Sequence, residues 1–97
     1  MTYLQIREYE RRTFLGPDGV EVIREGERLS FVGSGEQARR YLEEEITLLY
    51  EIDGRSSGAA IAEANRAVSG AEKGQRHEIA LDPEPIFWAE ISPVGEK

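Results

Sequence analysis

A glycine-rich stretch in the middle of the chain has the spacing of a dinucleotide-binding loop. It reads Gly33-Ser34-Gly35-Glu36-Gln37-Ala38, and Asp53 follows Gly33 by twenty residues. In such a site the glycines let the backbone approach a pyrophosphate at a helix N-terminus, and the acidic residue binds the ribose. Three features oppose this interpretation. The strands expected upstream form a meander, the chain is short for a doubly wound fold, and Glu36 places a carboxylate where the phosphate would lie. A strand-to-helix turn with an N-cap explains the glycines better.

A second motif, Gly54-Arg55-Ser56-Ser57-Gly58, matches the nucleophile elbow of esterases. That elbow needs a strand-to-helix turn on a parallel sheet, followed by an acid and a histidine. The only histidine, His77, lies downstream, with Glu63 and Glu72 between. Because the segment is expected to join two helices, we interpret it as a flexible linker that ends in the N-cap of the second helix. No catalytic residue is assigned.

Metal and cofactor sites lack their usual ligands. The chain has no cysteine and one histidine, so it cannot assemble a typical zinc site. The run Glu43-Glu44-Glu45 points in three directions from a helix and cannot converge on one cation. We therefore expect no metal and no cofactor, and a structural role for His77. The glutamates are expected to form a solvated face with ion pairs four residues away, to Arg39 and Arg40. An acidic recognition surface is the alternative.

Tyr3, Arg7, Tyr9 and Arg11 alternate along the first expected strand, so they share one face. Aromatic and basic residues in such a strip can stack on single-stranded nucleic acid. The net charge of −7 opposes that function, because nucleic-acid binding requires clustered lysine and arginine. The preferred interpretation is a solvated sheet face, or a face that a protein partner covers.

Trp88 is the only tryptophan and lies in a strand expected to be apolar on both faces. Phe87, Ala89 and Ile91 occupy one face, and Ile86 and Trp88 the other. Strands buried on both sides have this pattern. Trp88 is therefore expected in the core, with an interface hot spot as the alternative.

A helix from Gly35 to Asp53 is expected to organise these motifs. Ser34 and Gln37 have the spacing of a capping box at its start. Apolar residues then recur at three- and four-residue steps, over an arc wider than one sheet face requires: Ala38, Tyr41, Leu42, Ile46, Leu48, Leu49 and Ile52. The segment Ile46–Ile52 also has the composition of a strand. The continuous helix is preferred, because no glycine or asparagine would cap a helix that ended at Glu45.

The remaining segments predict strands and one short helix. A first strand over residues 2–14 is apolar at its start and charged beyond, which indicates a strand that outruns the core or contains a bulge. Further elements are expected as follows: strands at 20–23 and 29–32, turns at Gly16–Gly19 and Glu25–Glu27, a helix at 59–69 capped by Gly70, and strands at 77–81 and 86–91.

The predicted fold class is α+β, in the order β-β-β-α-α-β-β. It comprises an antiparallel sheet of about five strands, with one long and one short helix packed on one face. The domain is expected to span residues 1–91, with 92–97 as a flexible tail. No stretch has the pattern of a secretory signal, and none approaches the ~20 apolar residues of a membrane span. We therefore expect a cytoplasmic protein without a membrane partner.

Charge and size favour a protein partner with a basic surface, because an acidic field attracts such partners. The sequence predicts a small acidic, non-enzymatic protein-binding module. The working hypothesis is an inhibitor that occupies a basic nucleic-acid-binding surface, of the type of a phage anti-defence protein or a nuclease immunity protein. The alternatives are a homodimeric assembly protein, and nucleotide or single-stranded nucleic-acid binding. The residues expected to contact the partner are Glu43, Glu44, Glu51, Asp53, Tyr3, Arg7, Tyr9 and Trp88.

Overall fold

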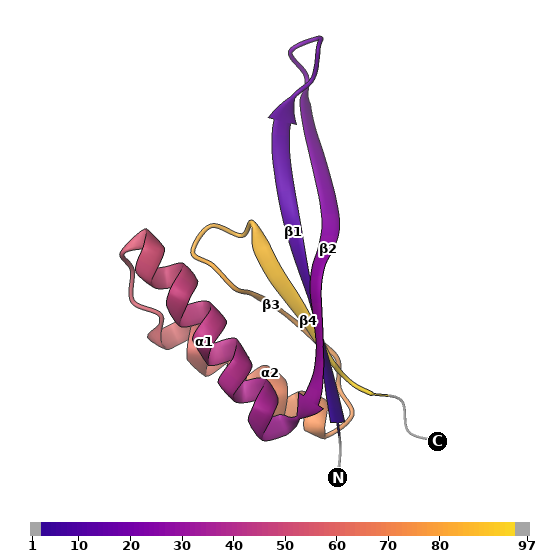
Figure 1. Ribbon diagram of the computed structural model, residues 1–97, viewed down its shortest axis with the longest axis vertical. Helices are drawn as coiled ribbons and strands as arrows, with labels where there is room; N and C mark the ends of the chain where they lie inside the picture. Colours follow the sequence, from indigo (N-terminus) through magenta and orange to yellow (C-terminus); the bar gives the residue numbers. More distant parts are fainter. Residues whose placement is uncertain (1–2, 95–97) are drawn as a thin grey trace.

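A computed structural model describes residues 3–94 as a four-stranded antiparallel sheet with two helices on one face (Figure 1). The strands lie in the order β2-β1-β4-β3, so the first and last strands of the chain are neighbours at the centre of the sheet. The expected α+β class, the antiparallel sheet and the packing of a long and a short helix are confirmed. The elements are β1 (Tyr3–Leu15), β2 (Glu21–Ser34), α1 (Gly35–Asp53), α2 (Gly58–Glu72), β3 (His77–Ala80) and β4 (Phe87–Pro93).

The strands expected at 20–23 and 29–32 are the two ends of one strand, β2. Residues 25–27 do not turn the chain, because they stay paired with β1 in an extended conformation. The pairing register shifts between Glu8 and Tyr9 of β1, where β2 holds one extra residue, Arg28. A β-bulge thus absorbs the irregularity that the sequence suggested was a turn. The observed order of elements is β-β-α-α-β-β.

The far ends of β1 and β2, residues 12–24, form a two-stranded arm that projects beyond the rest of the sheet (Figure 1). β4 pairs with β1 only as far as Glu10, and the amide of Arg11 donates to the Ile86 carbonyl. Beyond that point no third strand or helix of residues 3–94 lies beneath the arm. The Cα radius of gyration is 14.8 Å, whereas a compact chain of this length has about 12.5 Å. The expected strand that outruns the core is confirmed.

The hydrophobic core fills the space between the inner face of the sheet and the two helices. Its largest members are fully buried: Leu4, Ile6, Leu42, Ile46, Val68, Leu81 and Ile91. Helix α1 contributes Leu42 and Ile46 to this core, and it begins with the expected capping box. The Gln37 amide donates to Ser34 Oγ at 3.2 Å, and the Ser34 amide donates to Gln37 Oε1 at 2.9 Å. The helix continues to Gly54, which ends it with a φ of 76°. The continuous helix through residues 46–52 is confirmed.

Helix α2 runs to Glu72, past the glycine expected to cap it. Gly70 lies against His77, and a Cβ at that position would overlap the imidazole Nε2. The glycine therefore permits close approach of the segment that enters β3, and the helix needs no left-handed residue there. Ala64, Ala67 and Val68 are buried on the inner side of this helix.

The last described residues belong to the sheet. β4 extends to Pro93, and the Val94 amide donates to the Tyr3 carbonyl at 2.9 Å. Residues 92–94 thus continue the sheet where a tail was expected, and residues 95–97 lie outside the described part of the chain. Among residues 3–94, no helix combines the length and the apolar character that crossing a membrane requires.

Candidate functional site

The outer face of the sheet, opposite the helices, carries the only tryptophan. Phe87, Ala89 and Ile91 of β4 turn toward the helices, so the alternation of the strand turns Trp88 away from them. Tyr9 lies directly opposite on β1, and the two rings stack with centroids 5.6 Å apart and planes 21° from parallel. The expectation that Trp88 lies in the core, in a strand buried on both faces, is wrong. The two helices cover only one face of the sheet.

Arg11 places a positive charge over this aromatic pair. Its guanidinium carbon lies 5.1 Å from the centroid of the Trp88 ring. The register of β1 and β2 sets Arg11 opposite Glu25, and both Nε and Nη2 lie 2.9 Å from the Glu25 Oε2. Within the chain itself, the Arg11 guanidinium therefore both stacks on Trp88 and bonds to the Glu25 carboxylate.

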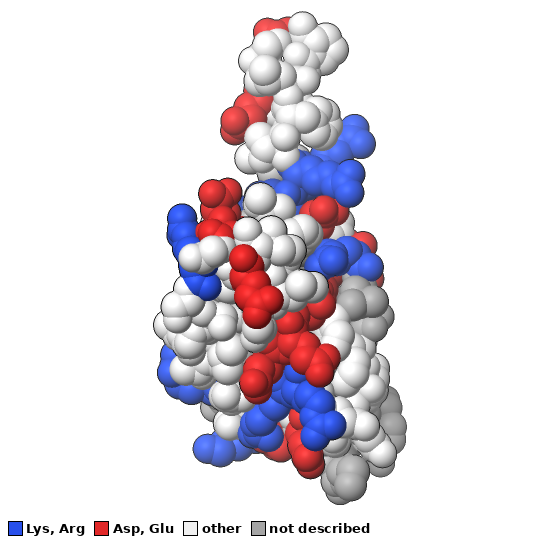
Figure 2. Space-filling view, turned by 60° about the vertical axis from the view of Figure 1, so that its left-hand side comes forward, with Lys and Arg blue, Asp and Glu red and all other residues white. Residues whose placement is uncertain are grey.

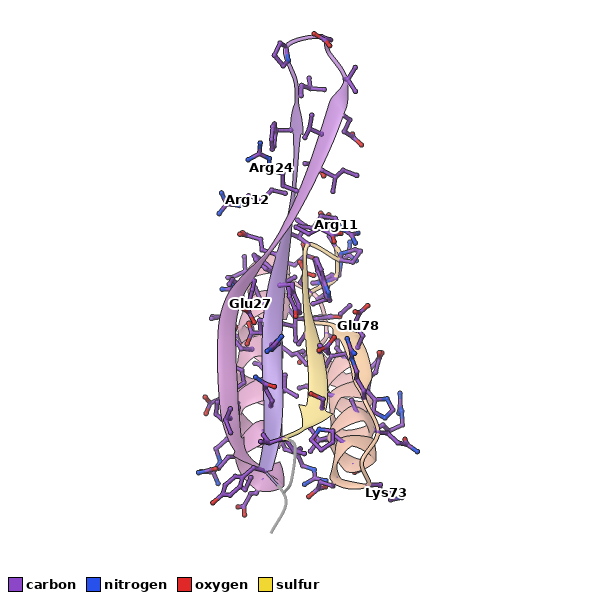
Figure 3. The ribbon with its side chains drawn as sticks, turned by 90° about the vertical axis from the view of Figure 1, so that its right-hand side faces the viewer. Arg11, Arg12, Arg24, Glu27, Lys73 and Glu78 are labelled. Atoms are coloured by element: carbon purple, nitrogen blue, oxygen red, sulfur yellow. The ribbon has the colours of Figure 1, made fainter. Side chains whose placement is uncertain are left out.

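Four glutamates surround Trp88 and Tyr9 on the outer face: Glu25, Glu27, Glu78 and Glu90. Arg7 lies 3.8 Å from Glu27, and Arg76 forms an ion pair with Glu90. Within the described residues Glu78 forms no ion pair. Figure 3 shows Arg11, Glu27 and Glu78 around the open face. The aromatic and basic side chains do share a face, as expected. The four glutamates there outnumber the arginines Arg7, Arg11 and Arg76 by one, so these residues carry a net charge of −1.

Two hollows flank the indole of Trp88. One, of about 300 Å³, lies toward Glu78 and Pro85, with Arg11 and Glu25 on its other side. The second, of about 360 Å³, lies toward Tyr9, Glu27 and Glu90. Pockets for drug-sized ligands begin at about 300 Å³, so each hollow has the size for a side chain. The outer face can thus receive projecting groups of a partner on both sides of Trp88.

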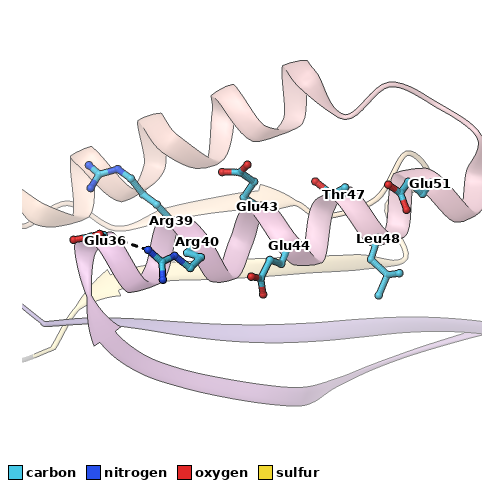
Figure 4. A pocket seen from close by; sticks show the side chains of 8 residues that line it. All are labelled: Glu36, Arg39, Arg40, Glu43, Glu44, Thr47, Leu48 and Glu51. Carbon is cyan, nitrogen blue, oxygen red and sulfur yellow. Dashed lines mark ion pairs between the residues drawn. The ribbon is translucent and has the colours of Figure 1, made fainter.

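The exposed face of α1 forms a separate acidic surface. Glu43, Glu44 and Glu51 lie on it, exposed to solvent (Figure 4). The expected ion pairs to these glutamates do not form, because both arginines have other partners. Arg40 lies 3.7 Å from Glu36, and Arg39 reaches across to Glu72 of α2 at 2.6 Å. Every side chain around this surface comes from one helix, so it is an open face and no enclosed cavity.

The eight residues expected to contact a partner therefore form two groups on opposite sides of the molecule. The sheet group contains Tyr3, Arg7, Tyr9 and Trp88. The helix group contains Glu43, Glu44 and Glu51, which lie on the exposed face of α1 (Figure 4). Asp53, at the C-terminal end of α1, is 2.7 Å from Arg55 and so is already paired. One partner surface cannot cover both groups without wrapping around the domain.

A buried carboxylate was missed by the sequence analysis. Glu8 is fully buried on the inner face of β1 and accepts hydrogen bonds from the Tyr41 hydroxyl and from Arg28 Nη1, the latter at 3.1 Å. Glu45 lies 3.7 Å from the same arginine. Burial raises the pKa of Glu8 above its usual 4.5, and the charge of Glu45 adds to this. The Tyr41 hydrogen bond and the Arg28 charge oppose it.

The same contacts act on Tyr41, whose ring stacks on Phe31 with centroids 4.8 Å apart. Burial and the hydrogen bond to Glu8 both raise the pKa of the Tyr41 hydroxyl. Both oxygens of Glu8 are thus engaged by the chain's own donors, which suits a structural link between β1, β2 and α1. The available sequence signal was Glu8 itself, an acidic residue in phase with Leu4 and Ile6.

The catalytic motifs considered from the sequence are not assembled. Ser56 and His77 lie beyond opposite ends of α2, whose fifteen residues span about 22 Å. At the start of α1 the Glu72 carboxylate lies against Gly35, where a bound phosphate would sit. Among the described residues, no three histidine, aspartate or glutamate side chains form a group that could hold a metal ion.

Comparisons of this chain with protein families, curated proteins and solved structures find no match.

Proposed function

We propose that this chain is a small acidic, non-enzymatic protein-binding module whose partner carries a basic surface. The observation that supports this most is the position of Trp88, stacked on Tyr9 on a sheet face that no described element covers. Tryptophan is enriched among the residues that dominate the energy of protein interfaces. The surrounding glutamates and the net charge of −7 complement a basic partner.

The acidic face of α1 supports an inhibitory form of this function, in which the partner extends around the domain and contacts both the sheet face and α1. Glu43, Glu44 and Glu51 project from one helix without an ion pair among the described residues. Glu43 and Glu44 are neighbours on the helix, and Glu51 lies seven residues beyond Glu44, about 10.5 Å along the helix axis. The three carboxylates therefore distribute negative charge along one face, and a surface that binds nucleic acid recognises negative charge in the phosphates. A partner that binds nucleic acid would then be blocked when this module occupies its basic surface.

The test is to capture the partner on immobilised protein and to measure its affinity for variants. Trp88→Ala should weaken binding about thirtyfold, the size of a typical hot spot of about 2 kcal/mol. Val32→Ala is the control, because Val32 is 59% exposed on β2 and is not among the residues expected to contact the partner; it should change the affinity little. Equal affinities for the Trp88→Ala variant and the unchanged protein would contradict the proposed binding face.

The inhibitory form has its own readout. If the captured partner binds nucleic acid, the protein should compete with that nucleic acid. Reversal of Glu43, Glu44 and Glu51 to lysine should abolish the competition, because it replaces three negative charges by three positive charges. Undiminished competition by this variant would remove the helix face from the mechanism.

The arm favours self-assembly as a second candidate function. Its apolar side chains, Phe14, Leu15, Val20 and Ile23, are all exposed, and the tip is uncharged over most of its surface (Figure 2). An isolated two-stranded hairpin is marginally stable in water, and a contiguous apolar patch commonly marks an interface. A second copy of the chain would cover these residues in a homodimer. Light scattering distinguishes the candidates, since a strict monomer at tens of micromolar removes the second.

A further inference from the structure

We infer that the hollow beside Trp88 is a binding site for an arginine side chain of the partner, which takes the place that Arg11, at the side of this hollow, holds over the Trp88 ring in the free protein. This inference rests on the proposed protein-binding function and names the group that the outer face recognises. It also assigns Arg11 a regulatory role, as an internal ligand that the partner's arginine displaces.

Arg11 shows what the site accepts. Its guanidinium stacks over the Trp88 ring at 5.1 Å and bonds to the Glu25 carboxylate at 2.9 Å. A planar guanidinium is suited to both contacts at once, whereas the ammonium of lysine is a compact, strongly hydrated charge without a stacking face. The site therefore favours arginine over lysine.

The hold on Arg11 is incomplete. The Arg11 side chain remains 44% exposed, and among the described residues it forms an ion pair only with Glu25. Exposed ion pairs of this kind contribute little, because water solvates both charges well. An arginine that arrives from a partner can therefore displace Arg11 at small cost.

Glu78 supplies the second carboxylate that an incoming arginine can use. It lines the same hollow of about 300 Å³ as Glu25 and Trp88, and it forms no ion pair within residues 3–94. Glu25 comes from β2 and Glu78 from the edge strand β3, so a guanidinium in this hollow lies between carboxylates on two strands. Figure 3 shows Glu78 and Arg11 on this face. Charge complementarity at this point fits an arginine and excludes an acidic group.

The test uses a tri-arginine peptide, with tri-lysine as the probe of equal charge. Trp88 is the only tryptophan, so the protein's tryptophan fluorescence reports on the outer face of the sheet around it. At low salt we expect tri-arginine to change the fluorescence saturably and to bind about two- to fivefold more tightly than tri-lysine, the range that one exposed cation–π contact supports. Equal affinity for the two peptides would overturn the assignment to arginine.

Two substitutions test the displacement. Arg11→Gln removes the competing guanidinium but keeps most of the stem, and should strengthen tri-arginine binding about two- to fivefold. Glu78→Gln should weaken it, whereas Glu63→Gln on α2, which removes the same charge from the helix side of the molecule, should leave it nearly unchanged. Weaker binding by Arg11→Gln, or equal effects of the two glutamate variants, would overturn the inference.

Failure of the arginine site can be distinguished from failure of the proposed protein-binding function. If tri-arginine fails to bind while capture of the partner still depends on Trp88, the protein-binding function stands and the arginine site does not. If capture is also independent of Trp88, both are wrong.

Discussion

Replacing Leu42 with alanine is expected to lower the free energy of unfolding by about 2–5 kcal/mol. Leu42 is fully buried in the middle of α1, where it packs between the inner face of the sheet and α2. The substitution removes apolar contacts and leaves a cavity that the surrounding residues fill only in part. Small domains are stable by about 5–15 kcal/mol in total, so this single change removes a large share. Denaturant titration followed by circular dichroism measures it.

Leu48 provides the matched control on the same helix. It is 54% exposed, on the solvent side of α1, although it belongs to the broad apolar arc seen in the sequence. Leu48→Ala should therefore change the free energy of unfolding by no more than about 0.5 kcal/mol. If Leu42→Ala and Leu48→Ala lowered the free energy of unfolding equally, the orientation of α1 against the sheet described above would be wrong.

Replacing Glu8 with glutamine is expected to change how stability depends on pH. The pKa of Glu8 is raised in the folded protein, so folding favours the protonated, neutral carboxyl. The stability from this group is fully present below its usual pKa of about 4.5 and is lost as the pH rises through the raised value. Glutamine is always neutral and has nearly the same shape. The variant should therefore gain stability, relative to the unchanged protein, as the pH rises from about 4.5 to about 7.

Glu8→Ala separates the charge from the hydrogen bonds. It also removes the titrating group, but it leaves the Tyr41 hydroxyl without its acceptor. The Glu8→Ala variant should therefore show the same pH dependence of stability as Glu8→Gln. Its free energy of unfolding should be about 1–3 kcal/mol lower than that of Glu8→Gln at every pH, which is the cost of an unsatisfied buried donor. A pH dependence for Glu8→Gln that matches the unchanged protein would show that the buried carboxyl does not titrate as its surroundings indicate.

The features predicted correctly from the sequence are local ones. The capping box joins Ser34 to Gln37, three residues apart, and helical periodicity placed Ala38, Leu42 and Ile46 on one buried face. The glycines around Pro17 predicted the turn at the tip of the arm, where Gly19 has a φ of 76°. Each of these depends on residues within a turn or two of the chain, so composition and spacing suffice to identify them.

The features predicted wrongly depend on partners that are distant in the sequence. Residues 25–27 have turn-forming composition, but pairing with β1 keeps them extended. Trp88 was placed in the core because its strand is apolar on both faces, whereas its actual neighbour on the outer face is Tyr9, which is distant in the sequence. The contact of Glu8 with Tyr41 spans 33 residues, and no spacing rule connects a strand to a helix across that distance.

The sequence identified some residues of the candidate site but did not show how they are arranged in space. The residues expected to bind a partner include Trp88 and Tyr9, which do lie together, and Glu43, Glu44 and Glu51, which lie on the opposite side. Charge and residue type indicate that a side chain is suited to binding. Only the fold decides which of these side chains one partner can reach.

The most direct test of the account is the nuclear magnetic resonance signal of the Trp88 indole N–H during titration with the captured partner. One tryptophan gives one such signal, and it reports on the outer face of the sheet. We predict that this signal shifts saturably as the complex forms and that tri-arginine shifts it in the same direction. An indole signal that stays unchanged while the complex forms would contradict the central claim that the sheet face around Trp88 binds the partner.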